Sequence, residues 1–260
     1  MLKNELKEII EKCNEDIGML VKDLSNNEIL FNYNEEKIYP SASIIKIPIM
    51  IEALSKVDTL EIPLLSQFKI KESDKVNFSV ITEQDLNECT FLDLITYMII
   101  NSDNTATNVL IDILGADKIN QKIKNLKMEN TKLQRKMMDF KAISEGKNNY
   151  TSLKDMLVVM EGLYKDEIIN KEISQIAIDI MKNQRDNSML KRYIQENITI
   201  ANKTGELDNL NNDVGIFYTK KADYFIGIFV NKAKNNRQAC EIIGKLSKKV
   251  YIHFISNKFL

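Results

Sequence analysis

Apolar residues in the middle of the chain recur mostly at intervals of three and four, which is the spacing of one buried face of an α-helix. The repeat continues through four stretches: Phe91, Leu94, Ile95 and Met98; Val109, Leu110, Ile113 and Leu114; Leu153, Met156, Leu157 and Met160; and Ile173, Ile176 and Ile180. Two stretches follow helix-start signals, since Thr90 with Asp93 resembles a capping box and Thr151-Ser152 precedes the third stretch. The pattern therefore predicts a helical central region.

The two ends of the chain show strand signals instead. Residues 17–24 and 28–33 are strand-like runs on either side of the turn-forming Ser25-Asn26-Asn27, and together they predict a β-hairpin. Residues 198–203, 214–218 and 224–230 predict three further strands. Amphipathic patterns over residues 2–13 and 236–256 predict a helix outside each group of strands.

These predictions combine into an α/β protein of the α+β type. We expect an antiparallel sheet of about five strands, built from both chain ends and flanked by the terminal helices, with an all-helical lobe beside it. The expected division places residues 1–48 and 195–260 in a discontinuous sheet domain, and residues 49–194 in a helical domain. A functional site is expected in the crevice between the two parts.

Composition excludes several classes of protein. The 36 basic and 37 acidic residues nearly cancel, which leaves no electrostatic footprint for nucleic acid, and no apolar run approaches the roughly 20 residues of a membrane span. The single histidine, His253, excludes most His-based zinc sites and a Ser-His-Asp hydrolase, and its helical spacing from Val250 favours a packing role. Cys13, Cys89 and Cys240 lack metal-site spacing and are interpreted as reduced packing residues. No metal and no cofactor is expected.

One serine and one lysine are distinguished by their surroundings. Ser43 and Lys46 lie three positions apart, so a helix that starts near Ser43 places a hydroxyl and an amine on one face. Only this pair precedes a long apolar run, over residues 47–51, that can bury the amine and lower its pKa. A neutral Lys46 would take the proton of Ser43 as the hydroxyl attacks a carbonyl. The same spacing occurs without that setting at Ser66 and Lys69, Ser144 and Lys147, and Ser188 and Lys191.

Two further patterns follow along the chain. Ser102-Asp103-Asn104 lies between two predicted helices, and Lys203-Thr204-Gly205 ends a predicted strand. Taken alone, the first pattern is more often a helix cap and the second a strand end, because these residue types favour such places. The three patterns together, in this order, characterise class A β-lactamases and penicillin-binding proteins.

The sequence therefore resembles the penicilloyl-serine transferase family, and class A β-lactamases most of all, over nearly its whole length. Residues 43–48 resemble the family's nucleophile helix, and residues 102–108 resemble its second motif and the helix that follows. The resemblance implies a serine hydrolase that acts on a small β-lactam or a related amide or ester.

The resemblance also implies a role for each motif residue. Ser43 would be the nucleophile, Lys46 the base or proton relay, and Ser102 the hydroxyl that passes a proton to the departing nitrogen. Asn104 would hold the acyl side chain of the substrate and steady Lys46, while Asp103 would serve the turn.

The third motif is expected to form the opposite wall of the site. Lys203 and Thr204 would bind the substrate carboxylate, and the positive charge of Lys203 would depress the pKa of Lys46. Gly205 would leave room for the substrate along the strand edge. The backbone N–H groups of Ser43 and Glu206 would form the oxyanion hole.

One part of the family pattern is missing. Class A β-lactamases carry a glutamate in the long loop before the third motif, where it activates the water that clears the acyl-enzyme. If Arg135 is aligned with the family's loop arginine, Met137 or Met138 falls at the glutamate position, and a thioether cannot act as a base. Asp139 or Glu145 would replace the glutamate if the loop folds differently; otherwise an Arg135–Asp139 ion pair would shape the loop.

Three hypotheses follow. The protein hydrolyses β-lactams through an acyl-Ser43 intermediate, or it is a penicillin-binding acceptor, peptidase or esterase that keeps its acyl group, or it is a non-catalytic binding domain of the same fold. We expect a monomer. The first residues carry acids among their bases and lack an apolar segment, so they predict no secretory signal. A cytoplasmic location is expected if Met1 is the native start, and an extracytoplasmic one, by family likeness, if a leader has been removed.

Overall fold

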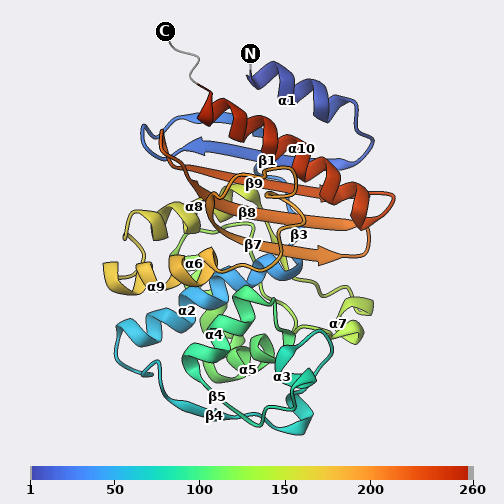
Figure 1. Cartoon of the computed structure of the whole chain (residues 1–260). Helices are drawn as coiled ribbons and strands as arrows, with labels where there is room; N and C mark the ends of the chain where they lie inside the picture. The colour runs from blue at the N-terminus through green and yellow to red at the C-terminus, as the bar shows by residue number, and fades with distance from the viewer. Residues whose placement is uncertain (1, 257–260) are drawn as a thin grey trace.

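The computed structural model of the chain describes residues 2–256. It contains one large sheet with the terminal helices on one face and a helical lobe on the other side (Figure 1). The strands are β1 (Asp16–Asp23), β2 (Ile29–Tyr33), β3 (Tyr39–Pro40), β4 (Gln67–Lys69), β5 (Glu88–Thr90), β6 (Tyr150–Thr151), β7 (Thr199–Leu207), β8 (Leu210–Tyr218) and β9 (Tyr224–Asn231). The α-helices are α1 (Leu2–Glu11), α2 (Lys46–Asp58), α3 (Val80–Glu83), α4 (Phe91–Ile100), α5 (Asn104–Leu114), α6 (Ala116–Asn125), α7 (Phe140–Ser144), α8 (Leu153–Tyr164), α9 (Lys171–Lys182) and α10 (Asn236–Ile255). Two short 3-10 helices are η1 (Ala42–Ile45) and η2 (Glu72–Asp74).

The main sheet is antiparallel and contains five strands in the order β2-β1-β9-β8-β7. Strand β1 from the N-terminal part pairs along its whole length with β9, from Asp16 opposite Asn231 to Asp23 opposite Tyr224. The predicted fold class, with about five strands drawn from both chain ends, is therefore confirmed. Strand β7 is an edge strand, so alternate backbone groups along it are free to bind something other than the sheet.

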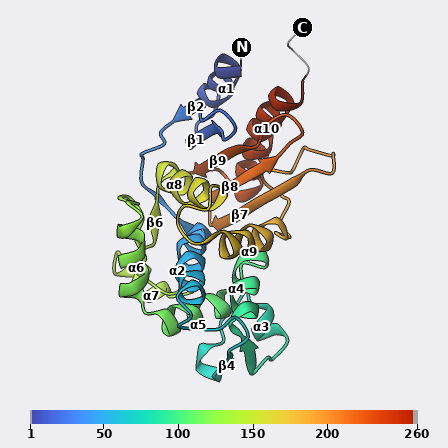
Figure 2. The ribbon, with the colours of Figure 1, turned by 90° about the vertical axis from the view of Figure 1, so that its left-hand side faces the viewer.

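Each face of the sheet is buried against helices. On β1, Met19 and Val21 belong to the apolar cluster that contains α1 and α10, whereas Leu20 points into the cluster of the helical lobe. This alternation follows from the two-residue period of a strand. Figure 2 shows α8 on the opposite side of the sheet from α1 and α10. Because both faces are covered, the central strand β9 is apolar at almost every position and buried throughout residues 224–230.

Helix α2 is the centre of the helical lobe. It is buried along most of its length, from Lys46 to Ser55, and packs against α4, α5, α6 and α9. Apolar residues on all sides of a helix indicate a buried helix, so the run that follows Ser43 fits this position. The capping box that Thr90 and Asp93 predict is present at the start of α4, with both reciprocal hydrogen bonds at 3.0 Å.

Several expectations differ in detail. The helix expected to start near Ser43 begins instead as the 3-10 turn η1, and α2 starts at Lys46. The loop expected between residues 134 and 149 contains the short helix α7. His253 is exposed on α10 because the buried stripe passes from Val250 to Phe254, four positions on, so the packing role was wrong. Within residues 2–256 no helix is long and apolar enough to cross a bilayer. The division into two domains stays a prediction.

Candidate active site

The turn that presents Ser43 is held from two sides. Strand β3 pairs with β6, and the Ser41 backbone N–H donates to the Asn149 carbonyl at 2.9 Å. From the sheet, the Asn212 amide donates to the Pro40 carbonyl at 3.0 Å. Ala42 has a φ of +47°, a conformation that costs energy for a residue with a Cβ. The surroundings therefore fix a sharp turn that places the Ser43 side chain on the wall of a cavity.

The Lys46 amine is fully buried beside this turn. It donates to the Ser102 carbonyl at 2.6 Å, to the Ser102 hydroxyl at 3.2 Å and to Asn104 Oδ1 at 2.9 Å. Burial lowers the pKa of Lys46 well below its usual value, and the nearby charge of Lys203 lowers it further. The negative charge of Asp103 opposes this shift only in part. Among the described residues the Ser43 hydroxyl has no hydrogen-bond partner, so the expected contact between Ser43 and Lys46 is not formed in this conformation.

Ser102 lies between two lysine amines. Its hydroxyl oxygen accepts from Lys46 at 3.2 Å and from Lys203 at 3.1 Å. A hydroxyl can accept two hydrogen bonds and donate one. The two lysine contacts use both acceptor positions, so the Ser102 proton remains free to be donated to another group. The backbone at Ser102 has a φ of +54°, which turns the chain sharply between α4 and α5.

Asp103 and Asn104 fix the second motif. The fully buried Asp103 carboxylate caps α5 through the Ala106 N–H at 2.8 Å, and it also accepts from the Ser79 hydroxyl at 3.0 Å and the Ile81 N–H at 3.1 Å. Asn104 donates to the Asn77 carbonyl at 3.2 Å while its oxygen accepts from Lys46. Asp103 thus serves the turn, and Asn104 steadies the lysine, as expected.

Gly205 lies against the nucleophile turn. A Cβ added to Gly205 would come within 3.0 Å of the Ser43 backbone nitrogen and 3.1 Å of the Ile44 backbone nitrogen. Contacts that short with backbone atoms cannot be relieved by a side-chain movement. The sequence suggested room for a substrate at this position; the structure shows in addition that the missing side chain lets β7 approach the turn closely.

Lys203 occupies a buried polar cluster behind the cavity. Its amine donates to the Ser102 hydroxyl and, at 2.7 Å, to the Thr204 carbonyl, and it does not line the cavity, whereas Thr204 does. Burial lowers the pKa of Lys203 to about 8, although the carboxyl groups of Asp213 and Asp186 oppose this shift. Burial raises the pKa of Asp213, which the sequence did not single out, to about 8. At neutral pH the Lys203 cation is therefore retained.

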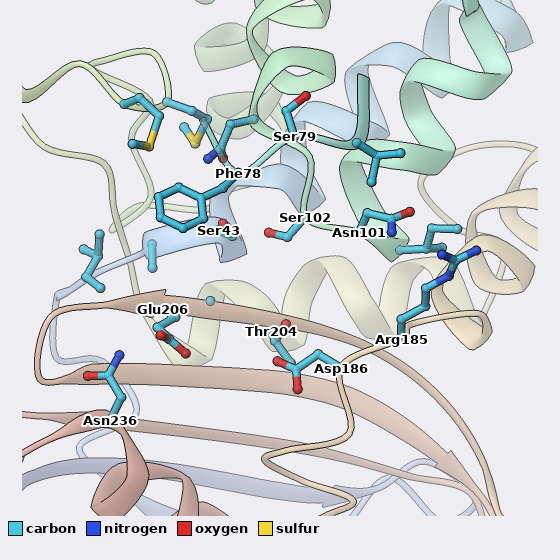
Figure 3. Close-up of a pocket in the computed structure, with 18 of the residues that line it drawn as sticks. Ser43, Phe78, Ser79, Asn101, Ser102, Arg185, Asp186, Thr204, Glu206 and Asn236 are labelled. Atoms are coloured by element: carbon cyan, nitrogen blue, oxygen red, sulfur yellow. The ribbon is translucent and has the colours of Figure 1, made fainter. Parts of the chain in front are cut away.

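The cavity has a volume of about 1000 Å³ and is drawn in Figure 3. Ser43, Ser102, Asn104, Thr204, Gly205 and Glu206, all expected at the site, line it together. Phe78 faces the same space, and its position in a polar, poorly periodic stretch of sequence gave no signal for this role. The structure thus brings the three motifs to one place.

The loop before the third motif presents thioethers to the cavity. Met137 and Met138 both line it, while Asp139 and Glu145 do not. The loop is anchored through Asn108 of α5, which accepts from the Met137 N–H at 2.7 Å and donates to the Met137 carbonyl at 3.1 Å. From the sequence, Asn108 was expected only as part of the helix that follows the second motif.

The two carboxylates proposed as replacements have other partners. Asp139 caps α7 by accepting from the Ala142 N–H at 2.9 Å, and Glu145 pairs with Lys147 at 3.3 Å. The expected Arg135–Asp139 ion pair is absent from the described part of the chain, because Arg135 donates to Asn148 at 3.1 Å and to a backbone carbonyl at 3.0 Å. No cluster of three or more His, Cys, Asp or Glu side chains in residues 2–256 could hold a metal ion.

Comparison with known proteins covers almost the whole chain. The family model described as the β-lactamase enzyme family matches residues 1–254. The chain is 24% identical over 270 residues to the β-lactamase BRO-1 of Moraxella catarrhalis, which covers 96% of this chain and 85% of that protein. It is 27% identical over 230 residues to the β-lactamase AER-1 of Aeromonas hydrophila, which covers 86% of this chain and 75% of that protein.

Solved structures agree in fold. A β-lactamase from Sphaerobacter thermophilus superimposes with a TM-score of 0.90 at 26% identity, over 96% of this chain and 97% of that one. PBP-A superimposes with a TM-score of 0.89 at 26% identity, over 97% and 95% of the two chains. A mutant of PBP-A, solved as an acyl-enzyme complex with penicillin G, gives a TM-score of 0.88 at 27% identity, over 97% of this chain and 96% of that one.

Proposed function

The chain belongs to the β-lactamase enzyme family, and from this premise we propose that it is a serine hydrolase of the class A type that β-lactams acylate on Ser43. The observation that carries the proposal is the buried network in which the Ser102 hydroxyl joins the amines of Lys46 and Lys203 beside the unpartnered Ser43 hydroxyl. In this proposal Ser43, Lys46 and Ser102 are the catalytic residues. Asn104, Thr204 and Gly205 form the binding wall, Lys203 lies buried behind it, and the backbone N–H groups of Ser43 and Glu206 hold the developing oxyanion.

Acylation begins at Ser43. A neutral Lys46 has two N–H donors and one lone pair; its two shortest contacts, to the Ser102 carbonyl and Asn104, use the donors. The neutral amine then no longer donates to the Ser102 hydroxyl, and its lone pair is available for a hydroxyl proton. As the Ser43 oxygen bonds to the carbonyl carbon, its proton passes to Lys46, and the negative charge on the carbonyl oxygen is stabilised by the backbone donors.

Collapse of the tetrahedral intermediate uses Ser102. When the bond between carbonyl carbon and nitrogen breaks, the nitrogen takes the proton of Ser102, and Lys46 returns its proton to the Ser102 oxygen 3.2 Å away. Every proton taken from Ser43 is thereby delivered to the leaving nitrogen. The retained charge of Lys203 keeps Lys46 neutral and attracts a substrate carboxylate bound at Thr204.

We propose that release of the acyl group is slow. Hydrolysis of the ester requires a base beside the ester carbonyl, and the loop lines the cavity with Met137 and Met138, while Asp139 and Glu145 do not line it and have other partners. Slow release of the acyl group also supports the second hypothesis, in which the protein is a penicillin-binding acceptor that keeps its acyl group for a long time. The acyl-enzyme complex of a PBP-A mutant with penicillin G is a precedent for an adduct on this fold. A non-catalytic binding domain is the third possibility.

Intact mass spectrometry distinguishes these possibilities. The protein is mixed with penicillin G, and its mass is followed over time for the wild type and for Ser43→Ala. We expect one adduct per chain in the wild type, slow loss of that adduct, and none in Ser43→Ala. Rapid turnover of a chromogenic cephalosporin without accumulation would establish an efficient β-lactamase. Absence of any adduct and any turnover would refute the proposed function and leave the binding domain.

A further inference from the structure

The two ends of the cavity have different chemistry. In Figure 3, Ser102, Asn101, Arg185 and Asp186 lie on one side of Ser43, whereas Glu206 and Asn236 lie on the other. Ser102 marks the side of the leaving nitrogen in the proposed reaction. The acyl side chain of a substrate therefore extends from the Ser43 ester toward the end that contains Glu206, which we call the acyl end.

Exposed apolar side chains gather at this cavity. Phe78 is 77% exposed, Phe140 is 66% exposed and Ile143 is 37% exposed, and all three line the cavity. Phe78 comes from the segment before α3, whereas Phe140 and Ile143 come from α7, beside Met138. Large apolar groups from separate segments that converge on one hollow leave a surface that an apolar ligand can cover. Aromatic rings in addition favour stacking against another ring.

The hairpin between β7 and β8 adds negative charge to the acyl end. Glu206 and Asp208 are both exposed and line the cavity, and Glu206 is steadied by the Asn211 amide, which donates to its carboxylate at 3.1 Å. The guanidinium of Arg135, which also lines the cavity, is already bound by Asn148 and a backbone carbonyl. The other charged groups on the lining are Glu83, Arg185 and Asp186, so acids outnumber bases by four to two.

We infer that the acyl end selects substrates whose acyl group is aromatic and positively charged, and that Glu206 and Asp208 set the preference for the charge. The inference rests on the proposed function and specifies its substrate class. The aromatic part of the acyl group packs against Phe78 and Phe140, and a cation on it faces the two carboxylates. An anion in the same position is repelled. Charges a few ångströms apart at an exposed site change a rate by roughly threefold to tenfold.

Three penicillins test the charge preference, because they differ only in one substituent on the carbon between the phenyl ring and the side-chain carbonyl. Benzylpenicillin is neutral there, aminobenzylpenicillin carries an amine and carboxybenzylpenicillin carries a carboxylate. The second-order rate of Ser43 acylation is measured by intact mass at about pH 6, where the amine is protonated. We expect the amine to react fastest and the carboxylate slowest, with roughly a threefold to tenfold step between neighbours.

Substitutions assign the preference to residues. The double variant Glu206→Gln and Asp208→Asn keeps the shape of both side chains, and it should bring the three rates to within about twofold of one another. Glu167→Gln removes an exposed carboxylate outside the cavity and should leave the wild-type ratios unchanged. Phe78→Ala should lower acylation by benzylpenicillin several-fold and spare a penicillin with a small alkyl side chain.

The outcomes separate the inference from the function beneath it. Equal rates for the three penicillins in the wild type would leave acylation of Ser43 standing and overturn the inference. Ratios that persist in the double variant would overturn the roles of Glu206 and Asp208. If none of the penicillins forms an adduct and none is hydrolysed, the proposed function fails and the inference fails with it. A melting curve for each variant confirms that a lost rate is not lost folding.

Discussion

Met137→Glu would place a carboxylate where the cavity now has a thioether. The Met137 side chain is 7% exposed and lines the cavity, and its backbone is fixed on both sides by the Asn108 amide, at 2.7 and 3.1 Å. Glutamate and methionine side chains have similar length, so the new carboxylate should occupy the same space as the thioether. We expect it to act as the general base that the wild-type site lacks, and to speed release of the acyl group from Ser43.

The magnitudes follow from the burial of Met137. Losing the transfer free energy of a buried methionine side chain costs about 2 kcal/mol. A largely buried carboxylate also has a raised pKa, and each unit of that shift costs about 1.4 kcal/mol in its charged form. We therefore expect the free energy of unfolding to fall by about 2 to 4 kcal/mol. A positioned general base raises a rate by roughly 100-fold to 10,000-fold, which sets the expected gain in deacylation.

The assay follows decay of the acyl-enzyme. Protein is acylated with penicillin G, free penicillin is removed, and loss of the adduct is followed by intact mass. Met137→Gln is the matched control, since it has nearly the shape of glutamate but no basic oxygen. The rate for Met137→Glu should also increase with pH through the raised pKa of the new carboxyl, because only the ionised form accepts a proton. Equal decay of the two variants, both folded and both acylated, would refute the reasoning.

Three further changes test the wild-type site. Gly205→Ala should lower the free energy of unfolding by about 1 to 3 kcal/mol and slow acylation, because the added Cβ would meet the Ser43 backbone nitrogen at 3.0 Å. Denaturant titration measures the stability and the rate of adduct formation measures acylation. An unchanged acylation rate would contradict the prediction. Asp103→Ala leaves three donors without their acceptor and should cost about 3 to 5 kcal/mol by denaturant titration, so a loss below 1 kcal/mol would be a refutation. The acylation rate should rise with pH as Lys46 loses its proton, below the usual lysine range, and fall above about pH 8 as Lys203 loses its own. In Lys203→Gln the fall of the rate above about pH 8 should disappear. The rise at lower pH should move to higher pH, because a like charge that lowers the pKa of Lys46 has gone. A pH profile identical to that of the wild type would exclude an effect of Lys203 on Lys46.

The fold was predictable because its signals are local and repeated. Residues 153–160 show the helical period that α8 uses, and residues 224–230 form an apolar run that suits a strand covered on both faces. The capping box at Thr90 fixes a helix start within a few positions. Details that depend on contacts distant in sequence could not be predicted from the local pattern. The turn that carries Ser43, for example, is a 3-10 helix, although its sequence predicted the start of an α-helix.

The candidate site was predictable as a set of residues but not as a set of contacts. Residue types and order pointed to Ser43, Lys46, Ser102 and Lys203, yet spacing suggested a direct contact between Ser43 and Lys46. In the structure Lys46 binds Ser102, which lies 56 positions along the chain and reaches the lysine only through packing of α4 and α5 on α2. The close approach of Gly205 to the turn is likewise a property of the assembled sheet, and no local pattern encodes it.

The position of β1 inside the sheet has a consequence for synthesis of the protein. Its neighbour β2 follows within a few residues, but its other neighbour, β9, ends at Asn231 and is made only after the whole helical lobe. While the ribosome adds the intervening residues, one edge of β1 and the apolar side chains of Met19 and Val21 have no cover from α10. Helices α2 to α9 can meanwhile associate with one another, since all of them precede β7. The nascent chain must therefore carry an unfinished sheet, open to aggregation or to a chaperone, until β9 and α10 emerge.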